Sequence, residues 1–322
     1  MTVQRVLVTG ANGFVGRALC AALTRDGVPV SAAVRSAAAA AGLPCPGIAV
    51  GDIGPQTDWS SALAGVDAIA HLAARTHVLR DPAADPLAEY RRTNVDASVC
   101  LARQAVAAGV GRIVFLSSIK VNGEFTRGHA FTEQDTPRPE DPYGLSKLEA
   151  EQRLAALCTG TQTRLNVLRP PLLYGPGVKG NLLALIRAIE RGVPLPLGAI
   201  HNRRTLLGID SLIAAIRLCL EHPRAGDGTF LVGDDRPVSS ADIARAIGRA
   251  LNRRARIVAV PVTLLRWGGA LLGRSAAIER LTSSLEVDSS AIRERLGWRP
   301  ACSFQQGIDA MVKGYLAQTK LE

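Results

Sequence analysis

The sequence predicts an α/β protein with a doubly wound parallel sheet and a smaller C-terminal lobe. Short strand-like runs alternate with longer helical patterns through the first half of the chain, which is typical of this class. A glycine-rich turn joins the first strand-like run to the first helical one. The length of 322 residues suffices for a large core shared by two lobes.

The predicted elements follow from the periodicity of the apolar residues. Strands are predicted over residues 3–9, 28–34, 68–72, 112–117 and 165–169, and helices over residues 14–25, 87–108 and 143–157. The alanine run at 37–41 is expected to form a loop or an extra turn. The rhythm becomes irregular after residue 170, so residues 171–322 are predicted to form mainly the smaller lobe. The chain is expected to return to the sheet near 205–235, at 205–209 and 229–232.

Composition excludes several classes of protein. A hydrophobic content of 47% with 20% charged residues indicates a globular chain. Six scattered cysteines without a Cys-x-x-Cys pair indicate reduced thiols, and His71 has no second His or Cys at ligand spacing, so no metal site is expected. The net charge of +10 comes from dispersed basic residues, and aromatic residues make up only 4%, which argues against a nucleic-acid partner.

The hydropathy of the chain favours a cytoplasmic protein without stable membrane insertion. The first strand-like run begins almost at the initiator Met, which leaves no room for a signal peptide. No run of 18 apolar residues occurs, because Arg266 interrupts the most apolar stretch. The segment 261–273 could pack internally or touch a membrane surface, and internal packing is the favoured interpretation.

The glycine-rich turn predicts a dinucleotide site. Gly10, Gly13 and Gly16 follow the strand-like Val6-Leu-Val-Thr and open a helix that includes Phe14 and Val15. Glycines at this spacing allow a tight turn and close approach of the backbone to a pyrophosphate. The helix N-terminus supplies N–H groups and a positive dipole to the anion. Residues 1–170 are therefore predicted to form a Rossmann-type dinucleotide-binding domain.

The end of the second predicted strand bears on the choice of cofactor. A carboxylate there would bond the ribose 2′-hydroxyl, but Val34 occupies that position and Arg35 follows it. A guanidinium suits a 2′-phosphate. NADP(H) is therefore favoured, NAD(H) stays as the alternative, and an ordinary surface role for Arg35 is the bland interpretation.

Tyr143 and Lys147 are the candidate proton-transfer pair. Their spacing of four places them one helical turn apart on one face of a helix. A nearby ammonium favours phenolate, so Lys147 is expected to lower the pKa of Tyr143 from its ordinary value of about 10. Such a phenol can donate and accept a proton without a histidine. Taken alone, the spacing also fits a plain surface pair.

Several motifs occur in a characteristic order along the chain. They are Thr9-Gly-x-x-Gly-x-x-Gly16, His71-Leu-Ala-Ala74, Ser117-Ser118, Tyr143-x-x-x-Lys147, and Arg169-Pro170 with Tyr174-Gly-Pro176. Together they resemble the extended short-chain dehydrogenase/reductase family, of the nucleotide-sugar epimerase/dehydratase type. The resemblance covers nearly the whole chain, because the segment from Asp288 to Trp298 is similar to the closing segment of that family.

The resemblance implies roles for individual residues. Ser118 would bond the reacting oxygen, Tyr143 would be the acid/base, and Lys147 would bind the nicotinamide ribose. Asn94 would support Lys147. The implied cofactor contacts are Gly10, Gly13, Phe14, Val15, Gly16, Arg35, Asp52, Ile53, Ala73, Ala74, Asn94, Tyr143, Lys147 and Arg169, and the implied substrate contacts are Ser118, Lys120, Asn181, Arg204 and Arg280. The resemblance also implies a UDP-sugar substrate and a homodimer formed through helices 87–108 and 143–157.

The chain departs from the family pattern after Ser118. Val121-Asn122-Gly123 stands where the family usually has Val-Tyr-Gly, and Lys120 stands near the place of a small hydroxyl residue. Family dehydratases carry an acidic pair near Ile119-Lys120, so dehydration is disfavoured. Lys120 could face the substrate or lie in solvent.

Three functions compete. The favoured one is an NADPH-dependent 4-reductase of a UDP-linked 4-keto-6-deoxy-N-acetylhexose, because residues 115–124 and 177–181 look like those of bacterial O-antigen enzymes and Arg35 favours NADP(H). The alternative is an NAD-dependent UDP-hexose 4-epimerase. A catalytically inactive dinucleotide sensor is the third, and the intact Ser118, Tyr143 and Lys147 count against it.

Overall fold

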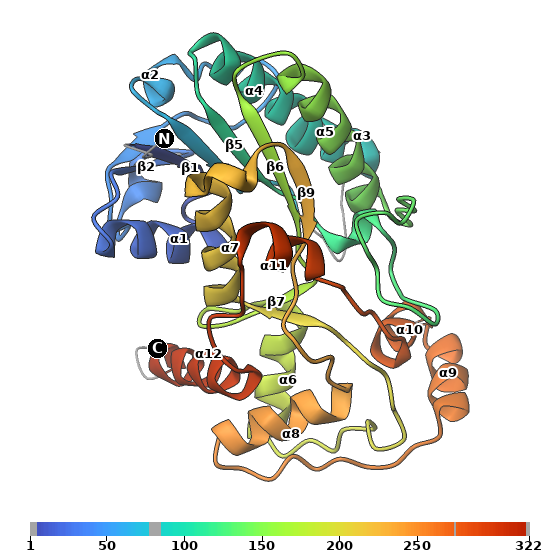
Figure 1. Ribbon diagram of the computed structural model, residues 1–322. Coiled ribbons are helices and arrows are strands. Elements are labelled where there is room, and N and C mark those ends of the chain that lie inside the picture. The colour runs from blue at the N-terminus through green and yellow to red at the C-terminus, as the bar shows by residue number, and fades with distance from the viewer. Residues whose placement is uncertain (1–4, 77–84, 274, 320–322) are drawn as a thin grey trace.

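A seven-stranded parallel sheet organises the protein (Figure 1). The computed structural model describes residues 5–76, 85–273 and 275–319. The strand order is β3-β2-β1-β4-β5-β6-β9, in which all neighbours are parallel. The strands are β1 (Val6–Thr9), β2 (Val30–Val34), β3 (Gly47–Ala49), β4 (Ala68–His71), β5 (Arg112–Leu116), β6 (Arg164–Arg169) and β9 (Gly228–Leu231). The predicted α/β class is confirmed.

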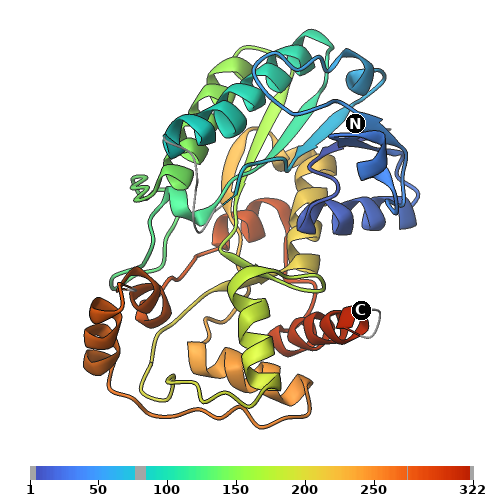
Figure 2. The same cartoon turned by 180° about the vertical axis from the view of Figure 1, so that it is seen from behind.

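Helices cover both faces of the sheet, as its two hydrophobic clusters require (Figures 1 and 2). The first face packs against α1 (Phe14–Arg25), α7 (Ile209–Glu221) and α11 (Ser290–Leu296). The second packs against α2 (Ser60–Leu63), α4 (Ala97–Ala107) and α5 (Pro142–Cys158). Because both faces are covered, β1, β2 and β4 consist entirely of buried residues, which explains their continuous apolar sequences.

The predicted helix over residues 87–108 is one helical segment with an irregular start. It comprises α3 (Pro86–Tyr90), a π-helical stretch (Arg91–Asp96) and α4. A π-helical turn is common at functional sites, and this one carries the buried Asn94 toward the candidate active site. The alanine run forms a 3₁₀ turn (Ala37–Ala40), as expected.

A second hydrophobic core defines the smaller lobe. It lies among α6 (Gly180–Glu190), α8 (Ser240–Ala250) and α12 (Phe304–Thr319), and α9 (Val262–Leu271) and α10 (Ser275–Thr282) lie at its edge (Figure 1). The expected return at 205–209 does not join the main sheet. Those residues form β8 (Leu206–Gly208), which pairs with β7 (Leu172–Tyr174) in a separate two-stranded sheet. The return at 229–232 is confirmed, since β9 is the edge strand of the main sheet.

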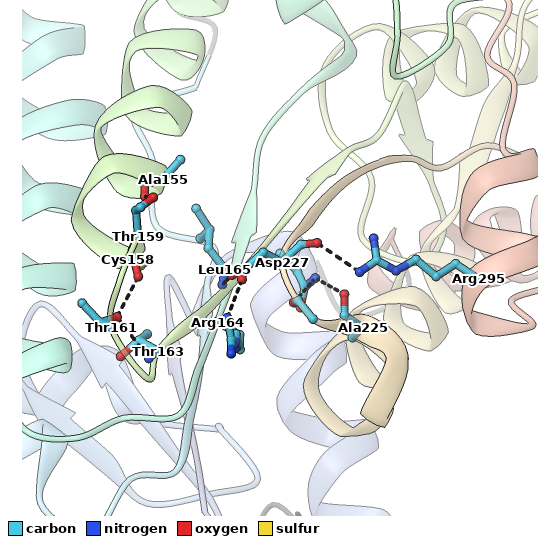
Figure 3. Close-up of polar contacts among 12 residues, drawn as sticks. Ala155, Cys158, Thr159, Thr161, Thr163, Arg164, Leu165, Ala225, Asp227 and Arg295 are labelled. Atoms are coloured by element: carbon cyan, nitrogen blue, oxygen red, sulfur yellow. Dashed lines mark hydrogen bonds and ion pairs between the residues drawn. The ribbon is translucent and has the colours of Figure 1, made fainter.

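Asp227 links β9 to β6 at the amino ends of the two strands, which is the end of the sheet away from the candidate site (Figure 3). Its carboxylate accepts a hydrogen bond from the Leu165 backbone N–H at 2.8 Å and pairs with Arg164 at 2.9 Å. Its carbonyl oxygen accepts a bond from Arg295 of α11 at 3.1 Å. These contacts fix the register in which Asn166 lies beside Gly228.

The apolar segment 261–273 corrects one expectation. It contains α9, whose Leu265 is partly buried against the smaller-lobe core. Leu264, Trp267 and Leu271, however, are exposed, so internal packing is wrong for them. No described helix is both long enough and apolar enough to cross a bilayer.

Candidate active site

The candidate site lies at the carboxyl ends of β1, β4 and β5. The chain runs from β1 outward to β2 and β3 on one side, and then resumes at β4 on the other side, so the strand order reverses between β1 and β4. Ligands of doubly wound sheets bind at such a switch point. The loops after these strands and the first turn of α5 bring the predicted site residues to this edge of the sheet.

The glycine turn after β1 forms a cradle that side chains would fill. Gly10 has φ +64°, and a Cβ there would lie 2.8 Å from the backbone nitrogen of Ala73. A Cβ on Gly16 would collide with the carbonyl oxygen of Gly10. Gly13 is the N-cap of α1, and no side chain caps that helix. The exposed backbone N–H groups and the helix dipole fit a pyrophosphate.

Gly16→Ala is expected to lower dinucleotide affinity by about tenfold or more, because a methyl group cannot enter beside Gly10 without moving the turn and the start of α1. Isothermal titration with the dinucleotide measures the change. Gly111→Ala is the matched control, since its Cβ would meet only ordinary contact, 3.6 Å from the oxygen of Asp67. Equal affinity in the wild-type and Gly16→Ala proteins would contradict a pyrophosphate cradle at this turn.

Ser118, Tyr143 and Lys147 come together beside this cradle. Tyr143 lies in the first turn of α5, which begins at Asp141-Pro142 because the Asp141 side chain accepts a hydrogen bond from the Gly144 N–H at 2.7 Å. The Ser118 hydroxyl, at the end of β5, hydrogen-bonds to the Tyr143 hydroxyl. Lys147 follows one turn along α5 and is buried, with its Nζ 4.0 Å from the centroid of the Phe115 ring.

The pKa of Tyr143 is raised, whereas the sequence led us to expect that it is lowered. Burial, followed by the negative charge of Asp141, raises the pKa of Tyr143 to about 12, although the hydrogen bond from Ser118 lowers it. Burial also lowers the pKa of Lys147 to about 7, against the opposing effect of the Glu151 carboxylate. Near neutral pH Lys147 is therefore only partly charged. A weakly charged ammonium cannot offset the desolvation of the phenol.

Arg169, at the end of β6, and Glu151 of α5 form a buried ion pair next to the candidate site. The guanidinium of Arg169 contacts both carboxylate oxygens of Glu151, with an Nη2–Oε2 distance of 2.5 Å, and donates to Asn122 at 3.0 Å. Ser117 donates a short hydrogen bond to the same carboxylate. Arg169 is 6% exposed. This placement favours a structural role for Arg169 over the predicted cofactor contact.

Asn94 links the helices around the site. Its side-chain amide donates to the Ser146 hydroxyl at 3.0 Å and to the carbonyl oxygen of Arg75 at 3.0 Å, and its oxygen accepts from the Arg75 N–H at 2.8 Å. Asn94 thus holds the loop after β4 against α5, immediately before Lys147. The predicted support of Lys147 is indirect in this arrangement.

His71 is a neutral bridge within the core. Its Nδ1 lies 2.7 Å from the Thr9 hydroxyl and its Nε2 lies 2.8 Å from the Ser98 hydroxyl. Burial, with a smaller effect of Lys147, lowers the pKa of His71 from 6.5 to about 3. Thr9 in turn accepts hydrogen bonds from the N–H groups of Leu72 and Ala73. His71 therefore helps to shape the loop that carries Ala73 and Ala74.

The burial of His71 predicts acid sensitivity. Because its pKa is lower in the folded than in the unfolded chain, the unfolded chain binds the extra proton between about pH 6.5 and pH 3. The free energy of unfolding is expected to fall through that window as the pH falls, by on the order of a few kcal/mol from this residue. His71→Asn should flatten this slope in urea unfolding measured at several pH values. His201→Asn, at an exposed position, is the control, and an unchanged slope in His71→Asn would contradict this assignment.

The predicted adenosine end of the site contains an ion pair. The Nε of Arg35 lies 2.5 Å from a carboxylate oxygen of Asp52, and both side chains are about three-quarters exposed. Ile53 packs against the second-face core. Sequence reasoning placed Arg35 and Asp52 here separately and missed their pairing, which comes from the neighbouring ends of β2 and β3.

Lys120 is held by two carboxylates. Its Nζ lies 2.5 Å from Asp141 and 2.6 Å from Glu124. Burial works against the charged form of Lys120, but these two partners together raise its pKa. The ammonium is therefore partly buried and fixed beside the first turn of α5 through Asp141, which precedes Tyr143 by two residues. The expectation that Lys120 lies free in solvent is therefore wrong.

Of the implied substrate contacts Arg204, Arg280 and Asn181, the structure brings together Arg204 and Arg280. The Nη1 of Arg204 donates to the carbonyl oxygens of Arg280, at 2.7 Å, and Ser283, at 3.2 Å. Burial lowers the pKa of Arg204, while the charge of Glu124 raises it. Arg280 lies on α10, and Asn181 is exposed in the first turn of α6.

Sequence reasoning missed Glu151 and Asp141, both of which act on the candidate catalytic residues. Glu151 lies four residues after Lys147, so it occupies the same face of α5 one turn later, and this spacing was the available signal. Asp141 precedes the proline at the start of α5, a position that favours a helix cap. No local pattern indicates that the charge of Asp141 acts on Tyr143.

Comparison with known proteins identifies the family. The model of the NAD dependent epimerase/dehydratase family matches residues 6–233, which include the glycine cradle, Ser118, Tyr143 and Lys147. The chain belongs to the NAD-dependent epimerase/dehydratase family. Its fold and the order of its motifs are those of extended short-chain dehydrogenase/reductases, and this membership makes it an enzyme.

Three known proteins illustrate the similarity, two of them over nearly the whole chain. It is 41% identical to a UDP-glucose 4-epimerase of Vibrio cholerae over 97% of this chain and 96% of that one. It is 26% identical to a dTDP-4-dehydro-6-deoxyglucose reductase of Escherichia coli over 68% of this chain and 66% of the relative. The structure of MoeE5 in complex with UDP-glucose and NAD superposes with a TM-score of 0.79 at 26% identity, covering 99% of this chain and 100% of MoeE5.

Proposed function

We propose that the protein is an NAD-dependent 4-epimerase of a UDP-hexose. The observation that carries the proposal is the 41% identity to a UDP-glucose 4-epimerase, which extends over 97% of the chain. The resemblance to the reductase is weaker and covers 68% of the chain. These relatives favour the epimerase over the 4-keto-sugar reductase that the sequence alone favoured.

The cofactor choice rests on Arg35. A guanidinium without a partner would suit a 2′-phosphate. The guanidinium of Arg35, however, is paired with the carboxylate of Asp52 at 2.5 Å. An incoming 2′-phosphate would have to displace this carboxylate and would be repelled by it. The MoeE5 structure, similar over the whole chain, holds NAD. The pairing therefore supports NAD(H) as the cofactor in place of NADP(H).

The chain supplies positioning and proton transfer. Gly10, Gly13 and Gly16 would hold the pyrophosphate, and Lys147 would bond the ribose of the nicotinamide. When bound, NAD supplies a reversible hydride acceptor beside the sugar C4. Tyr143 takes the proton of the C4 hydroxyl and later returns it, while Ser118 donates a hydrogen bond to the same oxygen.

The resting protonation state of Tyr143 suits only the second half of this role. With a pKa of about 12 the phenol is protonated at rest, so it must become a phenolate before it can take the proton of the C4 hydroxyl, and it then holds that proton for return to the C4 oxygen. For proton removal its pKa must fall, and a fully charged Lys147 is the group on α5 that can lower it. Binding of a hydroxyl-rich, polar ligand next to the buried Lys147 favours that charged form.

The test is conversion of UDP-galactose to UDP-glucose by the purified protein without added dinucleotide. The proposal predicts an equilibrium mixture of both sugars and NAD released on denaturation, detected by chromatography. The competing reductase predicts no interconversion, together with NADPH oxidation when a UDP-4-keto-6-deoxy sugar is supplied. A sensor would bind dinucleotide and turn over neither substrate.

A further inference from the structure

Helix α9 (Val262–Leu271) has two apolar faces, and only one of them packs against the protein. Val262 and Leu265 contact the smaller-lobe core, and Gly269 is buried. These three residues, together with the packing of α9 against α10, attach the helix to the lobe. The remaining apolar residues of the helix make no contribution to that core.

The second face is exposed to solvent. Leu264, Trp267 and Leu271 are three and four residues apart, so they lie on one side of the helix. They are 61%, 75% and 80% exposed, and the adjoining Leu272 is 73% exposed. Single exposed apolar residues are ordinary, but four large ones gathered on one helix mark an interaction surface. We call these four residues the α9 face.

A basic loop leads directly into α9. Arg253, Arg254 and Arg256 line a hollow in the smaller lobe together with Arg245 and Arg249 of α8. Among the residues that the structure describes, neither Arg253 nor Arg254 forms an ion pair. Figures 1 and 2 show this loop running along the edge of the smaller lobe that lies farthest from the seven-stranded sheet, and then entering α9. The arginine cluster thus lies where the loop leaves α8, and α9, with its exposed apolar side chains, begins at the other end of the loop.

We propose that this edge docks on the surface of an anionic phospholipid bilayer. Leucine and tryptophan side chains on one side of a helix enter the interface between headgroups and acyl chains. Arginines on the loop that precedes the helix gain from the negative surface potential. The proposal concerns attachment and does not depend on the reaction catalysed.

Trp267 is a built-in reporter for this docking. The other two tryptophans, Trp59 and Trp298, are each 1% exposed, so their emission is insensitive to the surface. Mixing the full chain with phosphatidylglycerol–phosphatidylcholine vesicles is expected to shift the tryptophan emission to the blue and to bring the protein down with the vesicles. Vesicles of phosphatidylcholine alone should bind at least about tenfold less, and raising the salt from about 0.1 M to about 0.5 M should weaken binding to the anionic vesicles.

Two pairs of variants make the test decisive. Leu264→Ser with Leu271→Ser is expected to lower the vesicle partition coefficient by at least about tenfold, while Leu316→Ser, at an exposed position on α12, leaves it unchanged. Arg253→Gln with Arg254→Gln should weaken binding to anionic vesicles, whereas Arg103→Gln with Arg299→Gln removes the same charge elsewhere without effect. Circular dichroism confirms that each variant is folded.

Three results would overturn the proposal. The first is no binding to anionic vesicles. The second is equal binding by the wild-type chain and the Leu264→Ser, Leu271→Ser variant. The third is a blue shift that depends on protein concentration without vesicles, together with self-association in analytical ultracentrifugation that the same variant abolishes. That result would assign the α9 face to a second copy of the chain.

Discussion

Tyr143→Phe is expected to lower kcat for 4-epimerisation by about a thousandfold, because it removes the hydroxyl that takes and returns the C4 proton. The phenyl ring keeps its packing, including the contact with Tyr90 at 6.0 Å between ring centroids. Dinucleotide binding and thermal stability should therefore change little. Initial rates of UDP-galactose conversion, with calorimetric titration of NAD, measure both quantities.

Tyr90→Phe is the matched control for this experiment. The change removes the hydroxyl that donates a hydrogen bond of 3.2 Å to the carbonyl oxygen of Thr76, and it keeps the ring that lies beside Tyr143. Its kcat should stay within a few-fold of the wild-type value. A Tyr143→Phe enzyme with normal turnover would contradict the assigned proton transfer, whichever sugar is the substrate.

Arg169→Met is expected to lower the free energy of unfolding by about 3–5 kcal/mol, because it leaves the Glu151 carboxylate buried without its cation. Arg169 and Glu151 are each 7% exposed in their side chains. Urea unfolding followed by circular dichroism measures the loss. The double variant Arg169→Met with Glu151→Gln should recover part of it, since no uncompensated charge remains.

Arg164→Met is the control for the buried pair, because Arg164 lies on the same strand and pairs with Asp227 at an exposed position. The expected loss there is below about 1 kcal/mol. If Arg169→Met instead left stability unchanged and weakened NAD binding, the structural role of Arg169 would be wrong and the predicted cofactor contact would be right.

The first half of the fold was predictable because its signals are local. The Phe14–Arg25 helix occurs at the predicted residues, and α5 differs by one residue at each end. Both begin at features visible in the sequence, a glycine N-cap and an Asp-Pro pair. The strands of the main sheet are buried on both faces, so their apolar runs stand out. The short β3 lacks such a run, since two of its three residues are exposed, and it was missed.

The errors concern relations between distant segments. The pairing of β8 with β7, in place of the main sheet, is a tertiary choice that residues 205–209 do not encode locally. The apolar content of α9 was taken to mean burial, although three of its five large apolar side chains face solvent. The pKa of Tyr143 is set mainly by burial and by Asp141, whereas the spacing had pointed to Lys147.

The sequence predicted which residues form the candidate site, but it did not predict which neighbouring charges shift their pKa values. Gly10, Gly16, Ser118, Tyr143 and Lys147 lie together as the motif order indicated. The charges that tune them, such as Glu151 beside Lys147, come from packing. The preference for a reductase over an epimerase rested on the resemblance of residues 115–124 and 177–181 to O-antigen enzymes and on Arg35, whose ion pair with Asp52 was not foreseen.

The most direct test of the proposed epimerase follows a deuterium label at C4 of UDP-galactose. An enzyme that removes the C4 hydride and returns it to the opposite face yields UDP-glucose with the deuterium still at C4, without added dinucleotide. Mass spectrometry and NMR of the product report both the retention and the position of the label. Retention at C4 is the predicted result, whereas loss of the label, or no UDP-glucose at all together with NADPH-dependent reduction of a 4-keto sugar, would contradict the epimerase.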